Sequence, residues 1–253
     1  MIVNRAWQGH FGTGIVATPV NFGTNGVAPS HPELLDYLAV DFMRSGWSLK
    51  RLHKLIMTST AYCQSAVQQG QPWLAKAQTA DPNNALLWRM NLRRLDAEPL
   101  RDSIIAAAGK LDATAGGPPV LLETRPDGVQ VVSSKAPAGS EWRRSVYLFS
   151  RRNYPVSFLG AFDFPTIDTT CARRTPSATP LQSLAMMNDA FVWRVAEALA
   201  QRAENNVEAA YQIVLARAPS AAEREQAQTY LRDHPFRAFA QALLSSNEFL
   251  YVD

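Results

Sequence analysis

The residues best suited to do chemistry in this chain are arginines that lie close to carboxylates in the sequence. Four arginine pairs stand at the ends of predicted elements: Arg93-Arg94, Arg143-Arg144, Arg151-Arg152 and Arg173-Arg174. The neighbouring acidic residues are Asp96, Glu98, Asp102, Asp163 and Asp168. Guanidinium groups bind carboxylates and other anions in a planar, two-pronged geometry. The pattern therefore indicates either a network of ion pairs that ties the middle of the chain to the helices, or a cleft for an anionic ligand.

For the second interpretation the ligand would be a carboxylated or sulfated glycan. The candidate ligand-binding residues are Asn4, Arg5, His10, Arg151, Arg152, Asn153, Asp163 and Arg173. Asp163 is flanked by Phe162 and Phe164, so we expect its carboxylate to be partly buried and therefore paired. Its nearest arginines along the following loop are Arg173 and Arg174, and Arg151 and Arg152 come next.

Other kinds of site have weaker support. Gly12-x-Gly14-x-x-Ala17 superficially matches a dinucleotide fingerprint, but no strand precedes it and Pro19 follows, so the glycines are expected to form turns. His10 and His31 are the two histidines expected to share any metal or catalytic role, and no metal site is predicted. A Ser-His-Asp enzyme is not indicated either, because the sequence lacks a G-x-S-x-G elbow.

The two cysteines give little indication of function. Cys63 and Cys171 belong to no C-x-x-C or C-x-x-C-H motif, so we predict no zinc ribbon, no thioredoxin-type site and no cofactor in this chain. A disulfide between them is possible, but unbridged, buried and inert thiols are the favoured prediction. Cys171 as a nucleophile would require a base near it, for which Asp163, Asp168 and His10 are the candidates.

Composition predicts a globular protein. The chain has 253 residues, 47% of them hydrophobic and 19% charged, with a net charge of +3 that does not indicate a nucleic-acid partner. No signal peptide and no apolar run of about 18 residues is present, so no membrane span is expected. The predicted organisation is a single α-rich domain over 1–253, with possible sub-domains 1–111 and 112–253.

The predicted fold class is mainly α, a helical domain with a small irregular β element in the middle. Gly- and Thr-rich residues 1–29 are expected to be loop or short extended pieces, and 63–80 an exposed linker. Capping and periodicity place helix starts at Ser30, Ser48, Asp81, Asp96, Thr179 and Ser220, and helices over Val207–Leu215 and Phe236–Phe249. The helix after Thr179 is expected to bury Leu181, Leu184 and Ala185 and to continue beyond Asn188-Asp189. Strands are predicted at Val129–Val132 and Ser145–Phe149.

A series of ordered motifs resembles one family. The motifs are Asn-Arg-x-Trp and Phe-Gly-x-Gly within 4–14, His-Pro-Glu-Leu-Leu-Asp at 31–36, Gly-Trp-Ser-x-Lys at 46–50, Arg94-Leu95-Asp96-Ala97-Glu98 with Arg101-Asp102, Arg144-Ser145-Val146-Tyr147, Phe162-Asp163, Thr179-Pro180-Leu181-Gln182-Ser183-Leu184, Asn188-Asp189 and the closing residues 246–253. Together they resemble domain of unknown function 1553, which is common in planctomycete and related bacterial proteins. Cys63 departs from the family pattern, in which a basic residue commonly follows the tyrosine.

The resemblance implies a setting and no catalytic residues. Family members usually form the C-terminal part of a large exported protein, often behind a c-type cytochrome module that holds the haem, and they continue before the Asn-Arg pair. We therefore expect an N-terminally truncated, extracytoplasmic module that packs against upstream domains of its own polypeptide and serves as an auxiliary or interaction domain. The alternative is a hydrolase or redox enzyme that acts on extracellular anionic polysaccharide, so enzymatic activity is left open.

Overall fold

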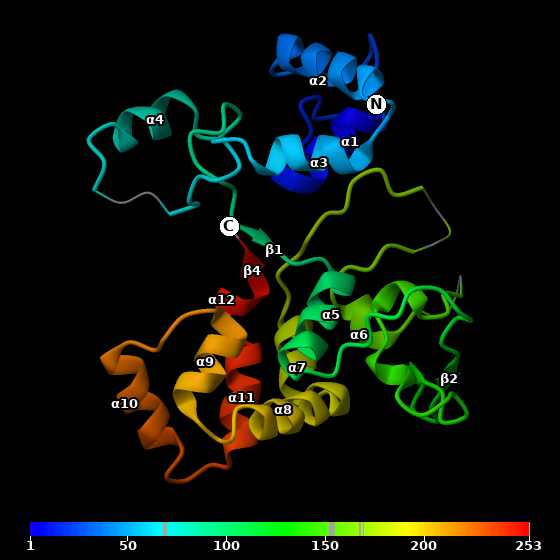
Figure 1. The fold of residues 1–253 in the computed structure, drawn as a ribbon, viewed down its shortest axis with the longest axis vertical. Helices are drawn as coiled ribbons and strands as arrows, with labels where there is room; N and C mark the ends of the chain where they lie inside the picture. The colour runs from blue at the N-terminus through cyan, green and yellow to red at the C-terminus, as the bar shows by residue number, and fades with distance from the viewer. Residues whose placement is uncertain (68–69, 152–154, 167, 169, 253) are drawn as a thin grey trace. The chain divides into compact units, whose positions relative to one another are not determined.

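The computed structural model describes residues 1–67, 70–151, 155–166, 168 and 170–252. Helices dominate these residues (Figure 1), which confirms the predicted mainly α class with a small β element in the middle. The helices are α1 (Ile2–Phe11), α2 (Pro32–Arg44), α3 (Leu49–Met57), α4 (Leu74–Ala80), α5 (Ala97–Ala107), α6 (Ser157–Ala161), α7 (Pro180–Asn188), α8 (Ala190–Arg202), α9 (Val207–Leu215), α10 (Ala221–Tyr230), α11 (Phe236–Leu244) and α12 (Asn247–Leu250). Two short 3-10 helices cover Ser140–Trp142 and Ser145–Tyr147.

The chain folds into two compact units, one over 1–93 and the other over 94–252. The boundary at Arg93 and Arg94 falls within the two-residue strand β1 (Arg93–Arg94). The division that the sequence suggested, at 111 and 112, lies inside the second unit. Whether the chain behaves as one domain stays a prediction, and each unit is described by itself below.

The first unit is built on α1, α2 and α3. Trp7, Phe11, Leu38, Phe42 and Leu52 form much of its buried apolar cluster. Residues 1–29 are therefore not all loop as predicted, because Ile2–Phe11 is a helix that buries one face and ends at Gly12 with φ of 82°.

The rest of the first unit departs from prediction at two other places. The predicted linker contains α4, and the helix expected from Asp81 is absent. The Asp81 carboxylate instead accepts hydrogen bonds from the backbone N–H groups of Ala85 (2.9 Å) and Leu86 (2.8 Å), which favours a turn over a helix. The helix predicted from Ser30 begins at Pro32. Ser48 caps α3 as expected, since its side chain accepts from Arg51 N–H.

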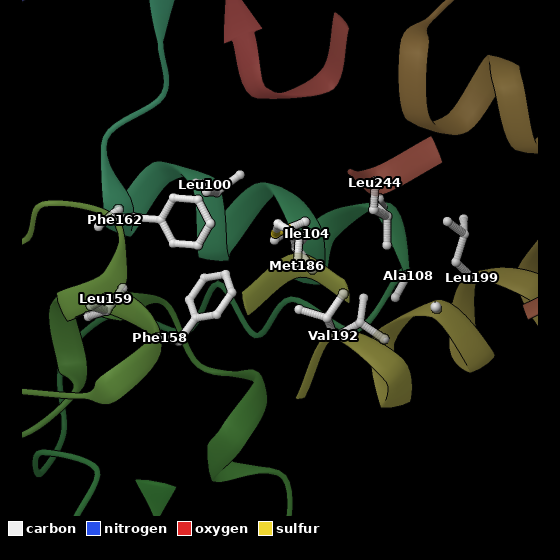
Figure 2. Packing of buried hydrophobic residues seen from close by; sticks show 14 of the residues in the cluster. Leu100, Ile104, Ala108, Phe158, Leu159, Phe162, Met186, Val192, Leu199 and Leu244 are labelled. Carbon is white, nitrogen blue, oxygen red and sulfur yellow. The ribbon is translucent and has the colours of Figure 1, made fainter. Parts of the chain in front are cut away.

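The second unit has its main core between α5, α6, α7, α8 and α11. Figure 2 shows Leu100 and Ile104 of α5 packed with Phe158, Phe162 and Met186. The helices α9, α10 and α11 enclose a smaller cluster around Ala210, Tyr211 and Phe239. Several caps are as predicted, including capping boxes at Thr179 with Gln182 and at Ser220 with Glu223, and α9 has the predicted bounds.

The β element of the second unit is small. Strand β2 (Leu122–Thr124) pairs antiparallel with β3 (Gln130–Val132), and Glu123 lies opposite Val131, which confirms the strand predicted at 129–132. At the chain end β4 (Tyr251–Val252) forms a second small sheet with β1, and Leu95 N–H donates to the Leu250 carbonyl oxygen (2.8 Å). Ser145–Phe149, predicted as a strand, begins with a 3-10 helix and contributes an isolated bridge at Leu148.

Three helical predictions in the second unit are wrong in detail. The helix from Thr179 does not run through Asp189, because this residue ends α7 and caps α8 by accepting from Phe191 N–H (2.8 Å). The stretch 236–249 is split into α11 and α12, with Ser246 as the cap of α12. The inner face of α7 carries Gln182 and Met186, and Leu181 and Leu184 are exposed.

Candidate functional site

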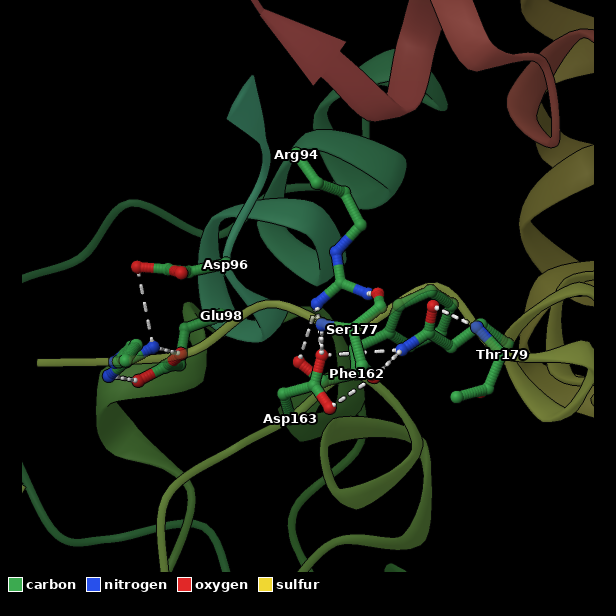
Figure 3. Close-up of polar contacts among 9 residues, drawn as sticks. Arg94, Asp96, Glu98, Phe162, Asp163, Ser177 and Thr179 are labelled. Atoms are coloured by element: carbon green, nitrogen blue, oxygen red, sulfur yellow. Dashed lines mark hydrogen bonds and ion pairs between the residues drawn. The ribbon is translucent and has the colours of Figure 1, made fainter. Parts of the chain in front are cut away.

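Asp163 lies at the centre of a polar network in the second unit (Figure 3). It follows α6 in the left-handed region with φ of 62°, which an aspartate tolerates better than most residues. Its Oδ2 accepts from Arg94 Nη2 (2.7 Å) and from the backbone N–H of Ser177 (2.8 Å). Its Oδ1 accepts from Ser177 Oγ (2.7 Å), and Gln182 Nε2 donates weakly to Oδ2 (3.3 Å). The carboxylate is thus paired, as the sequence predicted.

The cation that pairs with Asp163 is Arg94, not Arg173 or Arg174. The Arg94 side chain is 5% exposed and that of Asp163 is 27% exposed. Arg94 also donates to the carbonyl oxygens of Ser177 (2.6 Å) and Phe162 (3.2 Å). Burial raises the pKa of Asp163, but the hydrogen bonds from Ser177 and the Arg94 charge outweigh it and hold the pKa below its usual range. Asp163 is therefore ionised and fully engaged at neutral pH.

A second ion pair ties α5 to the segment before α7. Arg174 donates to both Glu98 oxygens, at 2.5 and 2.7 Å, and lies 3.6 Å from Asp96 (Figure 3). Burial raises the pKa of Glu98, but the Arg174 guanidinium more than offsets this and the net shift is downward. An arginine and a carboxylate favour this two-pronged geometry when they pair. It holds the first turn of α5 against residue 174.

Arg101 is a buried cation on α5. Its guanidinium donates to the carbonyl oxygens of Glu141 (2.5 Å) and Arg143 (2.9 Å) and lies 3.7 Å from Asp102. Burial lowers the pKa of Arg101, and the negative charges of Asp102 and Glu141 offset part of this shift. The resulting pKa is about 10. Asp102 in turn accepts from the backbone N–H and Oγ of Ser145, both at 2.7 Å. These bonds fix the 3-10 turn that the sequence suggested as a strand.

Arg143 holds a glycine turn. It donates to the carbonyl oxygens of Gly116 (2.5 Å) and Pro118 (3.0 Å), and its guanidinium lies 4.0 Å from the centre of the Tyr147 ring. Tyr147 Oη accepts from Gly116 N–H (2.8 Å). Gly116 has φ of 82°, a conformation that glycine adopts without strain. The arginine is therefore committed to the backbone of the irregular region.

In the first unit two histidines meet. His10 Nε2 lies 2.8 Å from His53 Nδ1, and the two rings pack edge to face with centroids 5.0 Å apart. Tyr62 packs edge-on against His10 at 5.4 Å between ring centroids. Burial lowers the pKa of His10, and the charges of His53 and Arg93 lower it further. The partner of His10 is thus His53 and not His31, whose Nδ1 bonds to Ser30 Oγ (2.9 Å).

The predicted ligand-binding residues are spread over both units. Asn4 is buried and bonds Val16 through both its amide atoms, Oδ1 to N–H (2.8 Å) and Nδ2 to the carbonyl (3.1 Å), so its role here is to hold a loop. Arg5, Arg151 and Arg173 are exposed, and Arg151 lies over the Phe149 ring at 5.4 Å. Arg152 and Asn153 lie outside the described residues.

Both cysteines are free and exposed, so the prediction of buried thiols is wrong. Cys171 Sγ donates to the Arg173 carbonyl oxygen (3.3 Å), and Cys63 Sγ donates to the Met57 carbonyl oxygen (3.6 Å). Across the described part of the chain, no group of three or more His, Cys, Asp or Glu residues is arranged to hold a metal ion. Asp168 is exposed.

Most of the buried and half-buried arginines of the second unit are therefore arranged to hold structure. Arg94, Arg101 and Arg174 bind carboxylates or backbone carbonyls, and these contacts compensate their charges. This supports the ion-pair network of the sequence analysis. An anionic ligand would have to compete with Asp163 for Arg94 or with Glu98 for Arg174.

Sequence reasoning missed three contributors: Arg94 as the partner of Asp163, Ser177 as its second donor and His53 as the partner of His10. Arg94 and Asp163 are far apart in the sequence, so proximity along the chain gave the wrong arginine. His53 was missed because His10 was expected to lie in a loop, and the helix α1 that places it against α3 was not predicted.

The geometry can be set beside known proteins. Neither the curated proteins nor the solved structures include a significant match to the chain. One family model does match, over residues 1–231, and it is described as PSD1, protein of unknown function (DUF1553). The match confirms the resemblance inferred from the motifs, and the chain belongs to this family.

Proposed function

We propose that this chain is an auxiliary interaction module of an exported bacterial protein, packed against upstream domains of the same polypeptide that include a c-type cytochrome module. In this proposal the chain holds no cofactor of its own, and any haem belongs to the upstream module. The setting outside the cytoplasm is likewise part of the proposal. In the described residues no helix has both the length and the apolar character needed to cross a membrane.

One observation carries the proposal: the outer face of α7 is apolar. Leu181, Leu184 and Met187 are 61%, 52% and 55% exposed and recur at helical spacing. The Asp163 network lies at the start of the same helix, where Gln182 contacts Asp163. The buried arginines Arg94 and Arg101 are compensated, whereas the described residues leave this apolar face exposed. Exposed apolar stripes of this kind mark surfaces that bind other proteins or domains.

The test is binding of this chain to the separately produced upstream segment of its full-length protein, measured by isothermal titration calorimetry. The double variant Leu181→Ser, Leu184→Ser should weaken binding by on the order of tenfold or more, because apolar anchors dominate such interfaces. Val146→Ser is the matched control, since Val146 is 72% exposed and belongs to the same unit. Thermal melts confirm that both variants fold.

Two results would contradict the proposal. Equal affinity of the double variant and the control would show that α7 is not the contact surface. Turnover of a sulfated or carboxylated polysaccharide by this chain alone would favour the alternative, a hydrolase or redox enzyme. The exposed Arg5, Arg151 and Arg173 would then be the residues to substitute.

A further inference from the structure

The histidine pair belongs to the first unit and is a separate feature from the α7 face of the second unit. His10 is in the last turn of α1 and His53 is in the middle of α3, and the two helices pack together. The facing side chains of these helices are buried, among them Phe11, Leu52 and Ile56. The backbone under both imidazoles is therefore fixed by core packing. The fold therefore holds the two backbones at a distance at which the ring nitrogens can meet.

The separation of the nitrogens is close to that of two ligands on one metal ion. His10 Nε2 and His53 Nδ1 are 2.8 Å apart. Two metal–nitrogen bonds of about 2.0–2.1 Å place their nitrogens about 2.9 Å apart when they meet at a right angle, and about 3.4 Å apart in a tetrahedron. A right-angled pair is typical of square-planar or tetragonal Cu²⁺ and Ni²⁺. The observed spacing fits this geometry after a small opening of the pair.

We propose that His10 and His53 form a two-histidine site for a divalent late transition metal, with Cu²⁺ bound most tightly and Ni²⁺ more weakly. The order follows the general affinities of nitrogen ligands for these ions. Water or a ligand from outside the chain takes the remaining coordination positions. The site thus has open positions.

In the metal-bound pair, the ion takes the place of the proton that lies between the two ring nitrogens. Without metal, the neutral pair is joined by a single N–H···N hydrogen bond, in which one ring donates and the other accepts. For both nitrogens to bind a metal, the donating ring moves its proton to its other nitrogen through water, and both lone pairs then point to the ion. No electron is transferred and no net proton is released from the neutral pair. His53 is exposed, so water reaches its ring and the side chain can turn by the amount required.

Two neighbours of His10 affect metal binding. Arg93 lies close to His10, and its Nη1 donates to the Gly9 carbonyl oxygen (2.9 Å). Its positive charge opposes a cation, and it makes the site weaker than a pair of histidines in neutral surroundings. Tyr62 packs against His10 by its ring edge and limits rotation of that imidazole.

Calorimetric titration with CuCl₂, repeated with NiCl₂, tests the site in the variant Cys63→Ser, Cys171→Ser. Both thiols are exposed and would otherwise react with Cu²⁺. We expect one equivalent of Cu²⁺ to bind at pH 7.5. His53→Ala in this background should weaken binding by on the order of a hundredfold, because one of two tethered ligands is lost. His234→Ala is the control, since His234 is exposed and packs on Tyr230 in the other unit.

Circular dichroism checks the fold of each variant, and His53→Gln replaces His53→Ala if the latter loses helix. The proposal is overturned if the parent shows no saturable binding, or if His53→Ala binds as tightly as His234→Ala. It is also overturned if His234→Ala weakens binding as much as His53→Ala.

Discussion

Replacing Asp163 should destabilise the second unit strongly. Removing one partner of a buried ion pair costs roughly 3–5 kcal/mol, because the other charge stays buried without compensation. Here Arg94 is 5% exposed, but it keeps two carbonyl acceptors, and Asp163 is 27% exposed. Both facts reduce the cost of losing the network to the bottom of this range or slightly below it, about 2–3 kcal/mol. Ser177 loses the acceptor for both its N–H and its Oγ, which adds to the loss.

Three substitutions separate the stability that the network contributes from the effect of backbone strain at residue 163. Asp163 has φ of 62°, so Asp163→Ala adds strain of about 1 kcal/mol that has nothing to do with the carboxylate. Asp163→Gly removes the carboxylate and relieves this strain, at a smaller cost in chain entropy of about 0.4–1 kcal/mol. Asp163→Asn keeps acceptor and shape but removes the charge. The expected order of stability is wild type, then Asn, then Gly, then Ala.

Thermal unfolding followed by circular dichroism measures the effect. For a chain of this size 1 kcal/mol corresponds to about 2–4 °C. The network and the added strain together cost about 3–4 kcal/mol, so Asp163→Ala should lower the Tm by roughly 6–16 °C. Asp127→Ala is the control, because the Asp127 pair with Arg125 is about half exposed on both sides. Such a surface pair contributes about 0–1 kcal/mol. If Asp163→Gly melts within about 1 °C of wild type, the network contributes nothing and the reasoning is refuted.

The same residue predicts a pH dependence. The fold lowers the pKa of Asp163 below the ordinary value of an aspartate. The stability that this carboxylate contributes is therefore fully present above about pH 4–5 and is lost as the pH falls through the lowered pKa. Asp163→Asn should melt closer to wild type at about pH 3 than at about pH 7. A difference between the two proteins that does not shrink in acid would contradict this assignment.

The remaining predictions concern glycine, cysteine and a second carboxylate. Gly14→Ala would place the new Cβ 2.6 Å from Nδ2 of Asn4, so it should lower the free energy of unfolding in urea by about 1–3 kcal/mol. Gly9→Ala is the control in α1, where the new Cβ meets open space, and it should raise that free energy by about 0.5–1 kcal/mol. Cys63 and Cys171 are exposed, so the folded protein should react with two equivalents of Ellman's reagent, and one equivalent or none would contradict this. Glu98→Gln should cost about 1 kcal/mol, and the cost should fall with added salt; a cost unchanged in high salt would argue against the ion pair.

The sequence predicted elements well where local signals decided them. Caps at Thr179 and Ser220 and the periodicity of Val207–Leu215 depend on residues within one or two turns. α1 was missed because the glycines and threonines after residue 12 dominated the interpretation of 1–29. Its buried Val3, Trp7 and Phe11 have helical spacing, so that signal was present in the sequence.

Tertiary contacts decided the elements that the sequence did not predict. Ser145–Phe149 has the composition of a strand, but Asp102 binds the N–H and Oγ of Ser145 and fixes a 3-10 turn. On α7 the apolar stripe through Leu181 and Leu184 is present, but it faces solvent and not the core. The core takes Met186 and Gln182, because Gln182 reaches Asp163 and Ser177. A periodic stripe shows that a helix has an apolar face, but not which partner covers it.

The arginines explain how the irregular middle of the chain is held in place. Residues 112–150 have few strand hydrogen bonds, yet their backbone carbonyls must be satisfied wherever they are buried. Arg101 and Arg143 supply several donors each from one side chain, which a single lysine could not do in the same planar geometry. The same commitment removes these charges from ligand binding. The groups that the fold leaves available include the apolar face of α7, the His10–His53 pair and the exposed Arg5, Arg151 and Arg173, and the function of the described surface is expected to depend on such groups.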